Sequence, residues 1–149
     1  MTNSERFRRL PVSQCLELLA AESVGRVGWN TTVGPQILPV SYALIDRRIV
    51  FRTTPDGPLT ELSQAQQVAF EIDAFDRALR TGWSVLVRGQ SAAATEPEDL
   101  FQLWNEADPV PWAPGHRNLF ITITTDVITG RVLTRPPGGD SDDEDRMAR

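Results

Sequence analysis

QILPVSYALIDRRIVFRTTPDGPLTELSQAQQVAFEIDAFDRALRTGWSVLVRG, residues Gln36 to Gly89, is the stretch that decides the fold. Its apolar runs are rich in β-branched and aromatic residues and are separated by turn-forming residues, which is the pattern of strands. A short helix is predicted from Pro58 to Gln64, because proline suits the first helical position. The predicted strands are Ile37–Ile45, Ile49–Thr53, Val68–Ile72 and Trp83–Gly89, the last continuing through Ala94, with a charged connection from Asp73 to Arg80.

The flanking sequence adds more strands and two helices. Apolar residues from Val12 onward recur at helical spacing, and Thr95 to Glu98 forms a capping box before a second helix. Further strands are predicted at Gly25–Asn30, Leu119–Thr124 and, as a short terminal piece, Gly130–Leu133. About six strands with short helices and no βαβ alternation predict a mainly β protein, built as an antiparallel barrel. Pro39 lacks an amide donor and predicts an edge position for its strand.

The length of 149 residues suits one domain. We expect a flexible N-terminus over residues 1–11 and a barrel domain over residues 12–134. Residues 135–149 include five acids between Asp140 and Asp145 and almost no apolar side chains, so a disordered acidic tail is expected.

Composition excludes several classes of function. The chain has no basic patch, which argues against nucleic-acid binding, and no apolar run of membrane-spanning length. The single cysteine, Cys15, cannot form an internal disulfide and is expected to be a small core residue, which fits a cytoplasmic protein. All 15 basic residues are arginine, so no lysine Schiff base with pyridoxal phosphate can form.

Six segments, in order, carry a resemblance: GRVGW, ILPVSYAL, RIVFRTTPDG, VAFEID, TGWSVLVRG and PWAPGHR. Together they resemble the pyridoxamine 5′-phosphate oxidase-like superfamily, and more narrowly its small actinobacterial branch related to nitroimidazole-resistance proteins. The similarity covers residues 12–133. It implies a six-stranded antiparallel split β-barrel with short helices, usually a homodimer with flavin mononucleotide (FMN) at the subunit interface. Some relatives use the deazaflavin F420, some bind haem, and some have no demonstrated cofactor.

The resemblance also implies a set of cofactor-binding positions. The strand through Pro39, Val40 and Ser41 matches the segment that lines the flavin ring with its backbone. Arg52, Thr53 and Thr54, with the Gly57 amide, match the positions at the phosphate end. Trp83 and Ser84 match a polar pair that holds the flavin in the family. Trp112 and Arg117 belong to a loop that closes over the dimer site.

Two departures from the family pattern bear on activity. Pro58 stands where the family's phosphate-binding lysine is expected, and it offers neither a charge nor an amide hydrogen. Asp56 adds a carboxylate nearby. The chain also lacks the arginine-rich C-terminal segment of the true oxidases, so pyridoxamine phosphate oxidation is not expected. The prediction is an FMN-binding oxidoreductase-like homodimer; the alternative is a non-catalytic dimer with a degenerate phosphate site, or a binder of F420 or haem.

Simpler explanations exist for several of these residues. Arg52 could pair with Glu71 or Asp73, which share one face of a strand, and Trp83 could be a buried anchor. Glu71 and Asp73 themselves suit a solvated strand face better than an acid–base pair. His116 is the only histidine and has no Cys, Asp or Glu at ligand spacing, so no metal site is predicted, and no catalytic residue is assigned.

Overall fold

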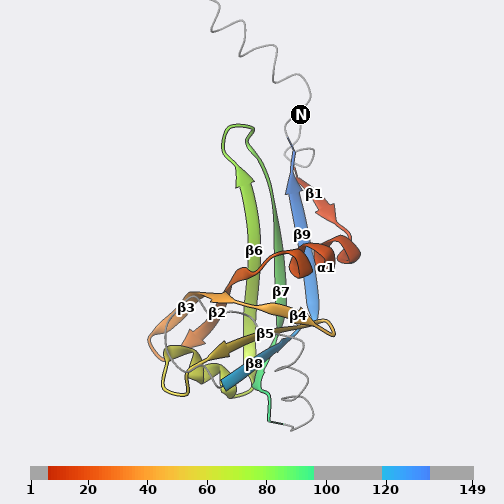
Figure 1. Ribbon diagram of the computed structural model, residues 1–149. Helices are drawn as coiled ribbons and strands as arrows, with labels where there is room; N and C mark the ends of the chain where they lie inside the picture. Colours follow the sequence, from red (N-terminus) through yellow and green to blue (C-terminus); the bar gives the residue numbers. More distant parts are fainter. Residues whose placement is uncertain (1–6, 96–118, 135–149) are drawn as a thin grey trace, which may run out of the picture.

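The computed structural model describes residues 7–95 and 119–134, which contain nine strands, one α-helix and one 3-10 helix (Figure 1). The elements are β1 (Phe7–Leu10), α1 (Val12–Ala21), β2 (Val24–Thr31), β3 (Gly34–Ser41), β4 (Ala43–Ile45), β5 (Arg48–Thr53), η2 (Pro58–Ser63), β6 (Gln66–Asp76), β7 (Thr81–Ala93), β8 (Leu119–Thr124) and β9 (Val127–Leu133). The predicted helix after Thr95, the predicted acidic tail, and Trp112, His116 and Arg117 all lie outside the described residues.

The strands form one antiparallel sheet in the order β3-β2-β6-β7-β8-β5-β4, and β9 pairs with β7 and β1. The end strands β3 and β4 do not pair with each other, so the sheet curls without closing. The predicted mainly β, antiparallel split barrel is confirmed, and so is the edge position of Pro39 on β3. The structure has nine strands where about six were predicted.

One extra strand arises because the predicted strand Ile37–Ile45 divides at Tyr42. Ser41 still pairs with Val24 of β2, whereas Ala43 already pairs with Val50 of β5. The amide of Tyr42 donates to the carbonyl of Ser23 at 3.0 Å, which fixes the division. The chain therefore passes from one half of the barrel to the other at this residue, and this is where the barrel is split.

The other differences lie at the opposite end of the sheet. Phe7–Leu10, within the segment predicted to be flexible, forms β1 by pairing with the exposed edge of β9. The first half of the predicted connection Asp73–Arg80 is instead strand, because β6 and β7 stay in register out to Asp76 and Thr81. We call residues 73–84 the arm; in Figure 1 this hairpin end projects beyond the crossing strands β4, β5 and β8.

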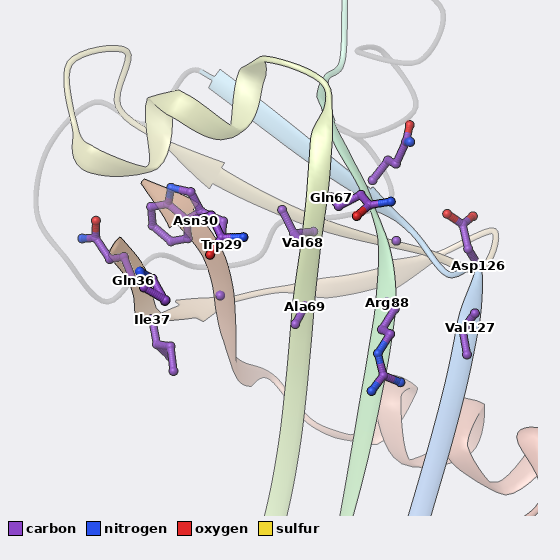
Figure 2. Close-up of a pocket in the computed structure, with 14 residues that line it drawn as sticks. Trp29, Asn30, Gln36, Ile37, Gln67, Val68, Ala69, Arg88, Asp126 and Val127 are labelled. Atoms are coloured by element: carbon purple, nitrogen blue, oxygen red, sulfur yellow. The ribbon is translucent and has the colours of Figure 1, made fainter. Parts of the chain in front are cut away.

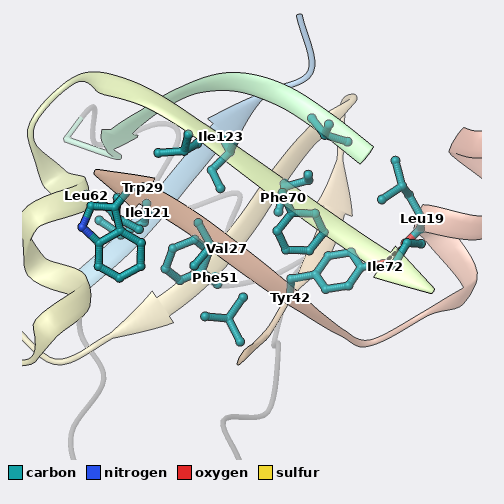
Figure 3. Close-up of a cluster of buried hydrophobic side chains, with 14 of the residues drawn as sticks. Leu19, Val27, Trp29, Tyr42, Phe51, Leu62, Phe70, Ile72, Ile121 and Ile123 are labelled. Atoms are coloured by element: carbon teal, nitrogen blue, oxygen red, sulfur yellow. Dashed lines mark hydrogen bonds between the residues drawn. The ribbon is translucent and has the colours of Figure 1, made fainter. Parts of the chain in front are cut away.

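The core lies between β2, β6 and β7 on one side and β5 and β8 on the other (Figure 3). Phe51 and Phe70 are fully buried there, and Tyr42 meets the Phe70 ring edge-on at a centroid distance of 4.8 Å. Leu59 and Leu62 bury the inner side of η2.

Helix α1 is attached to this core through Cys15 and Leu19, which are both buried. The Tyr42 hydroxyl donates to the Leu19 carbonyl at 2.6 Å, joining the helix to the split in the barrel. Burial raises the pKa of the Cys15 thiol, which opposes thiolate formation. The prediction that Cys15 is a core residue is confirmed.

Candidate functional site

Beyond the division at Tyr42, β3 and β5 lie next to each other without pairing, and we call this region the mouth. Ala43 pairs with Val50, so counting back along both strands places Ser41 at the level of Arg52 and Pro39 at the level of Thr54. Strand β3 pairs with β2 there and also contacts β5. The mouth thus brings together two segments that the resemblance assigned to one cofactor site.

A 3-10 helix closes one end of the mouth and is held in place from two sides. The Trp29 indole N–H on β2 donates to Glu61 Oε2 on η2 at 2.9 Å. The carbonyl of Thr54 accepts hydrogen bonds from the Gly57 amide at 3.3 Å and from the Thr60 hydroxyl at 3.1 Å. These bonds fix the turn between β5 and η2.

The same turn gathers polar atoms around Gly57. A Cβ added to Gly57 would lie 2.8 Å from Thr54 Oγ1 and 3.8 Å from Thr53 Oγ1, so the missing side chain leaves a small hollow beside two hydroxyls. Neither hydroxyl is hydrogen bonded to another described residue. The Gly57 N–H, in contrast, donates a hydrogen bond to the carbonyl of Thr54. The turn itself therefore uses the amide that was predicted to be a phosphate donor.

Arg52 lies at this end of the mouth with its guanidinium over the Phe120 ring, 5.3 Å from the ring centroid. The cation–π contact orients the side chain. The alternative pairing with Glu71 or Asp73 is not seen, because those carboxylates face Arg26 on β2.

The structure separates Trp83 and Ser84 from the mouth of their own chain. Arg52 pairs with Phe120, and the next residue, Ile121, pairs with Ala93 at the far end of β7. Ser84 lies nine residues before Ala93, which is roughly 30 Å of strand. Trp83 packs against the core, as a buried anchor would, and Ser84 faces the opposite side of the sheet. One small ligand cannot contact both places within one chain.

The outer face of the sheet carries a group of charges next to the arm. Arg26 Nη1 lies 3.6 Å from Glu71 Oε1 and 3.7 Å from Asp73 Oδ2, and Glu71 Oε1 is buried without a hydrogen-bond partner among the described residues. Burial, together with the neighbouring Asp73, raises the pKa of Glu71 to about 7 against the opposing effect of Arg26. Glu71 is therefore partly protonated near neutral pH.

This shift makes stability depend on pH. The pKa of Glu71 in the folded state exceeds its ordinary value of 4.5. The contribution of Glu71 to the free energy of unfolding is therefore complete below pH 4.5 and is lost as the pH rises through about 7. Glu71→Gln should leave the free energy of unfolding nearly unchanged at about pH 5 and raise it by about 1 kcal/mol at about pH 8.5, a figure discounted for the 34% exposure of the side chain. Urea unfolding at both pH values measures this, with exposed Glu17→Gln as the control. If the free energy of unfolding depends on pH in the same way in wild type and Glu71→Gln, this prediction is contradicted.

A groove of about 610 Å³ on the same outer face was not predicted from the sequence (Figure 2). It is lined by residues of β2, β3, β6, β7 and the start of β9, and by none of the residues assigned to the cofactor site. Its residues are far apart in the sequence and meet only through strand register, so no local motif marks it.

Within residues 7–95 and 119–134, no cluster of three or more His, Cys, Asp or Glu side chains is placed to hold a metal ion. The helices in these ranges are also too short or too polar to cross a membrane.

Known proteins match this chain over most of its length. The family model described as pyridoxamine 5′-phosphate oxidase matches residues 11–132. An uncharacterized protein of Mycobacterium tuberculosis is 30% identical over 122 residues, covering 78% of this chain and 79% of that one.

Solved structures share the fold. A protein of Corynebacterium glutamicum superposes with a TM-score of 0.75 at 26% identity, covering 91% of this chain and 98% of that one. An FAD binding protein from Mycobacterium smegmatis gives a TM-score of 0.71 at 25% identity, covering 84% and 97%. The family model spans most of the chain, and the curated relative is similar over most of its own length. The chain belongs to the pyridoxamine 5′-phosphate oxidase-like family.

Proposed function

We propose that this protein binds a flavin, FMN in the first place, with the phosphate end in the mouth beside Arg52, Thr53 and Thr54. The observation that carries the proposal is the hollow at Gly57, beside two hydroxyls without partners among the described residues, at the end of the strand that carries Arg52. Hydroxyl and guanidinium donors are suited to a phosphate. A relative at 25% identity is described as an FAD binding protein, which supports a flavin as the ligand class.

We further propose that the site is completed by a second copy of the chain. Ser84 matches a flavin-holding position of the family but lies roughly 30 Å along β7 from the level of Arg52. The arm also exposes Phe75 and Leu79, at 62% and 51%, which is unusual for a hairpin end that covers nothing. In a homodimer, the arm of one protomer would reach the mouth of its partner.

The flavin would supply the redox chemistry when bound, and the chain would orient it and shape its surroundings. Simple hydride or electron transfer needs no protein acid at the site, which suits an oxidoreductase whose mouth contains no catalytic cluster among its described residues. Cys15 is free and buried, consistent with the reducing cytoplasm that we propose as its location.

A non-catalytic dimer is the second candidate, and specific observations favour it. Pro58 cannot donate, Asp56 adds a negative charge, and the Gly57 amide is occupied. The mouth therefore has fewer phosphate donors than the family pattern implies. F420 or haem would be the remaining cofactor alternatives.

Fluorescence titration of the purified protein with FMN separates the two candidates. Wild type should quench flavin fluorescence saturably, and Arg52→Ala should weaken binding by about 1.5–3 kcal/mol, the range for a charge-assisted hydrogen bond. Arg88→Ala, an exposed arginine on the outer face that is not assigned to the flavin site, is the control and should bind as wild type does. Absence of saturable binding would favour the non-catalytic dimer, and equal affinity of Arg52→Ala would show that the phosphate lies elsewhere.

A substitution in the opposite direction strengthens the test. Pro58→Lys restores the expected family residue at the start of η2 and should tighten FMN binding, while leaving riboflavin, which lacks the phosphate, unaffected. A gain for both ligands would argue against a phosphate at this position.

A further inference from the structure

The outer-face groove is formed by one row of residues that crosses five strands. Register places Ile37 beside Gly28, Gly28 beside Ala69, Ala69 beside Arg88, and Arg88 beside Val127. The two residues in the middle are small, and the walls at the two ends are apolar side chains, Ile37 at 68% exposure and Val127 at 48%. The row is therefore a trough whose floor is nearly bare sheet.

Polar groups line this trough on one side. Arg88 is exposed and forms no ion pair with any carboxylate in residues 7–95 and 119–134. Gln67 and Gln90 pair across β6 and β7 in the next row, and their side-chain amides are not hydrogen bonded to other described residues. Figure 2 shows Arg88 and Gln67 extending from neighbouring strands, and it also shows Asp126, whose carboxylate lines the trough as well.

These features specify a ligand class. A bare floor of sheet backbone between two aliphatic walls suits a flat ring, and a guanidinium without an ion-pair partner among the described residues suits a carboxylate or phosphate. The side-chain amides of Gln67 and Gln90 can donate to or accept from ring heteroatoms or exocyclic oxygens. The volume of about 610 Å³ is within the ordinary range for small-molecule sites.

We propose that the trough is a second ligand site, which takes a small planar heteroaromatic anion with its ring on Gly28 and Ala69 and its charge on Arg88. The trough contains none of the residues proposed to hold the flavin, so the inference stands independently of flavin binding. Its occupant would be a substrate or effector of the protein and not its phosphate-anchored cofactor.

Nitrogen–proton correlation spectra of the full chain, titrated with nicotinate and with nicotinamide, test the charge requirement without any variant. Nicotinate should shift the amides of residues 28, 69 and 88 saturably in the millimolar range, and nicotinamide, the uncharged analogue, should bind at least about tenfold more weakly. Phenyl phosphate, run in parallel, distinguishes a phosphate preference from a carboxylate preference. Failure of both anions to shift these amides would overturn the proposal.

Variants then locate the site. Arg88→Leu should weaken nicotinate binding about tenfold or more, and Ala69→Leu should abolish it by filling the floor. Arg131→Leu is the matched control, because Arg131 is an exposed arginine of the same sheet that does not line the trough. Equal weakening by Arg131→Leu, or unchanged binding in Ala69→Leu, would overturn the proposal. Thermal melting confirms that each variant is folded.

Discussion

Gly89→Ala is expected to destabilise the protein more than any other alanine substitution of a glycine in the described barrel. A Cβ at this position would lie 1.7 Å from the carbonyl oxygen of Thr124 and 2.7 Å from its carbonyl carbon. The clash is with backbone, so no side-chain rotation can relieve it. Gly89 lies where β7 changes partners, from β9 at Arg88 to β8 at Ser91, and the chain between β8 and β9 crosses it closely.

The expected loss is about 3 kcal/mol or more in the free energy of unfolding, at or beyond the upper range for overpacking. Urea unfolding followed by tryptophan fluorescence measures it. Gly28→Ala is the matched control, because its Cβ would meet only Ile37 and a backbone oxygen at ordinary contact distances of 3.5 and 3.7 Å. Equal midpoints for the two variants would show that the crossing at Gly89 is not closely packed.

The fold was predictable because its decisive signals are local. Alternating apolar runs between Gln36 and Gly89 identified the strands, Pro39 identified an edge, and Pro58 identified the start of η2. The division at Tyr42 was not predictable, because the residues on both sides of it have strand character and only their partners differ. The extent of the arm was missed because its solvent-exposed strands carry charges that resemble a loop.

The candidate site was predictable only in part, for the same reason. Arg52, Thr53 and Thr54 are adjacent in sequence and lie at the end of β5 that leads into η2. The hydrogen bond that occupies the Gly57 amide depends on the conformation of a turn, which the residue types do not specify. The trough around Arg88 depends on the register of five strands, and register is not visible in any one of them.

Ser84→Trp on the arm should abolish flavin binding, a loss of more than about a hundredfold. Ser84 is partly buried on the outer face of the arm, where an indole would occupy space that we assign to the partner's flavin. The loss would occur although Ser84 lies roughly 30 Å along β7 from the level of Arg52 in its own chain. FMN titration measures it, with Thr129→Trp on neighbouring β9 as a control for bulk on the same sheet. Wild-type affinity in Ser84→Trp would exclude the arm from the site.

Mixing two inactive variants tests the central claim that each flavin site is shared between protomers. Arg52→Ala disables the mouth and Ser84→Trp disables the arm, so each homodimer should remain empty at an FMN concentration that fills wild type. A heterodimer would combine an intact mouth with an intact arm at one of its two sites. Co-refolding equal amounts should therefore restore binding to about one quarter of all sites. If heterodimers are shown to form and no FMN binding is restored, the shared site is contradicted.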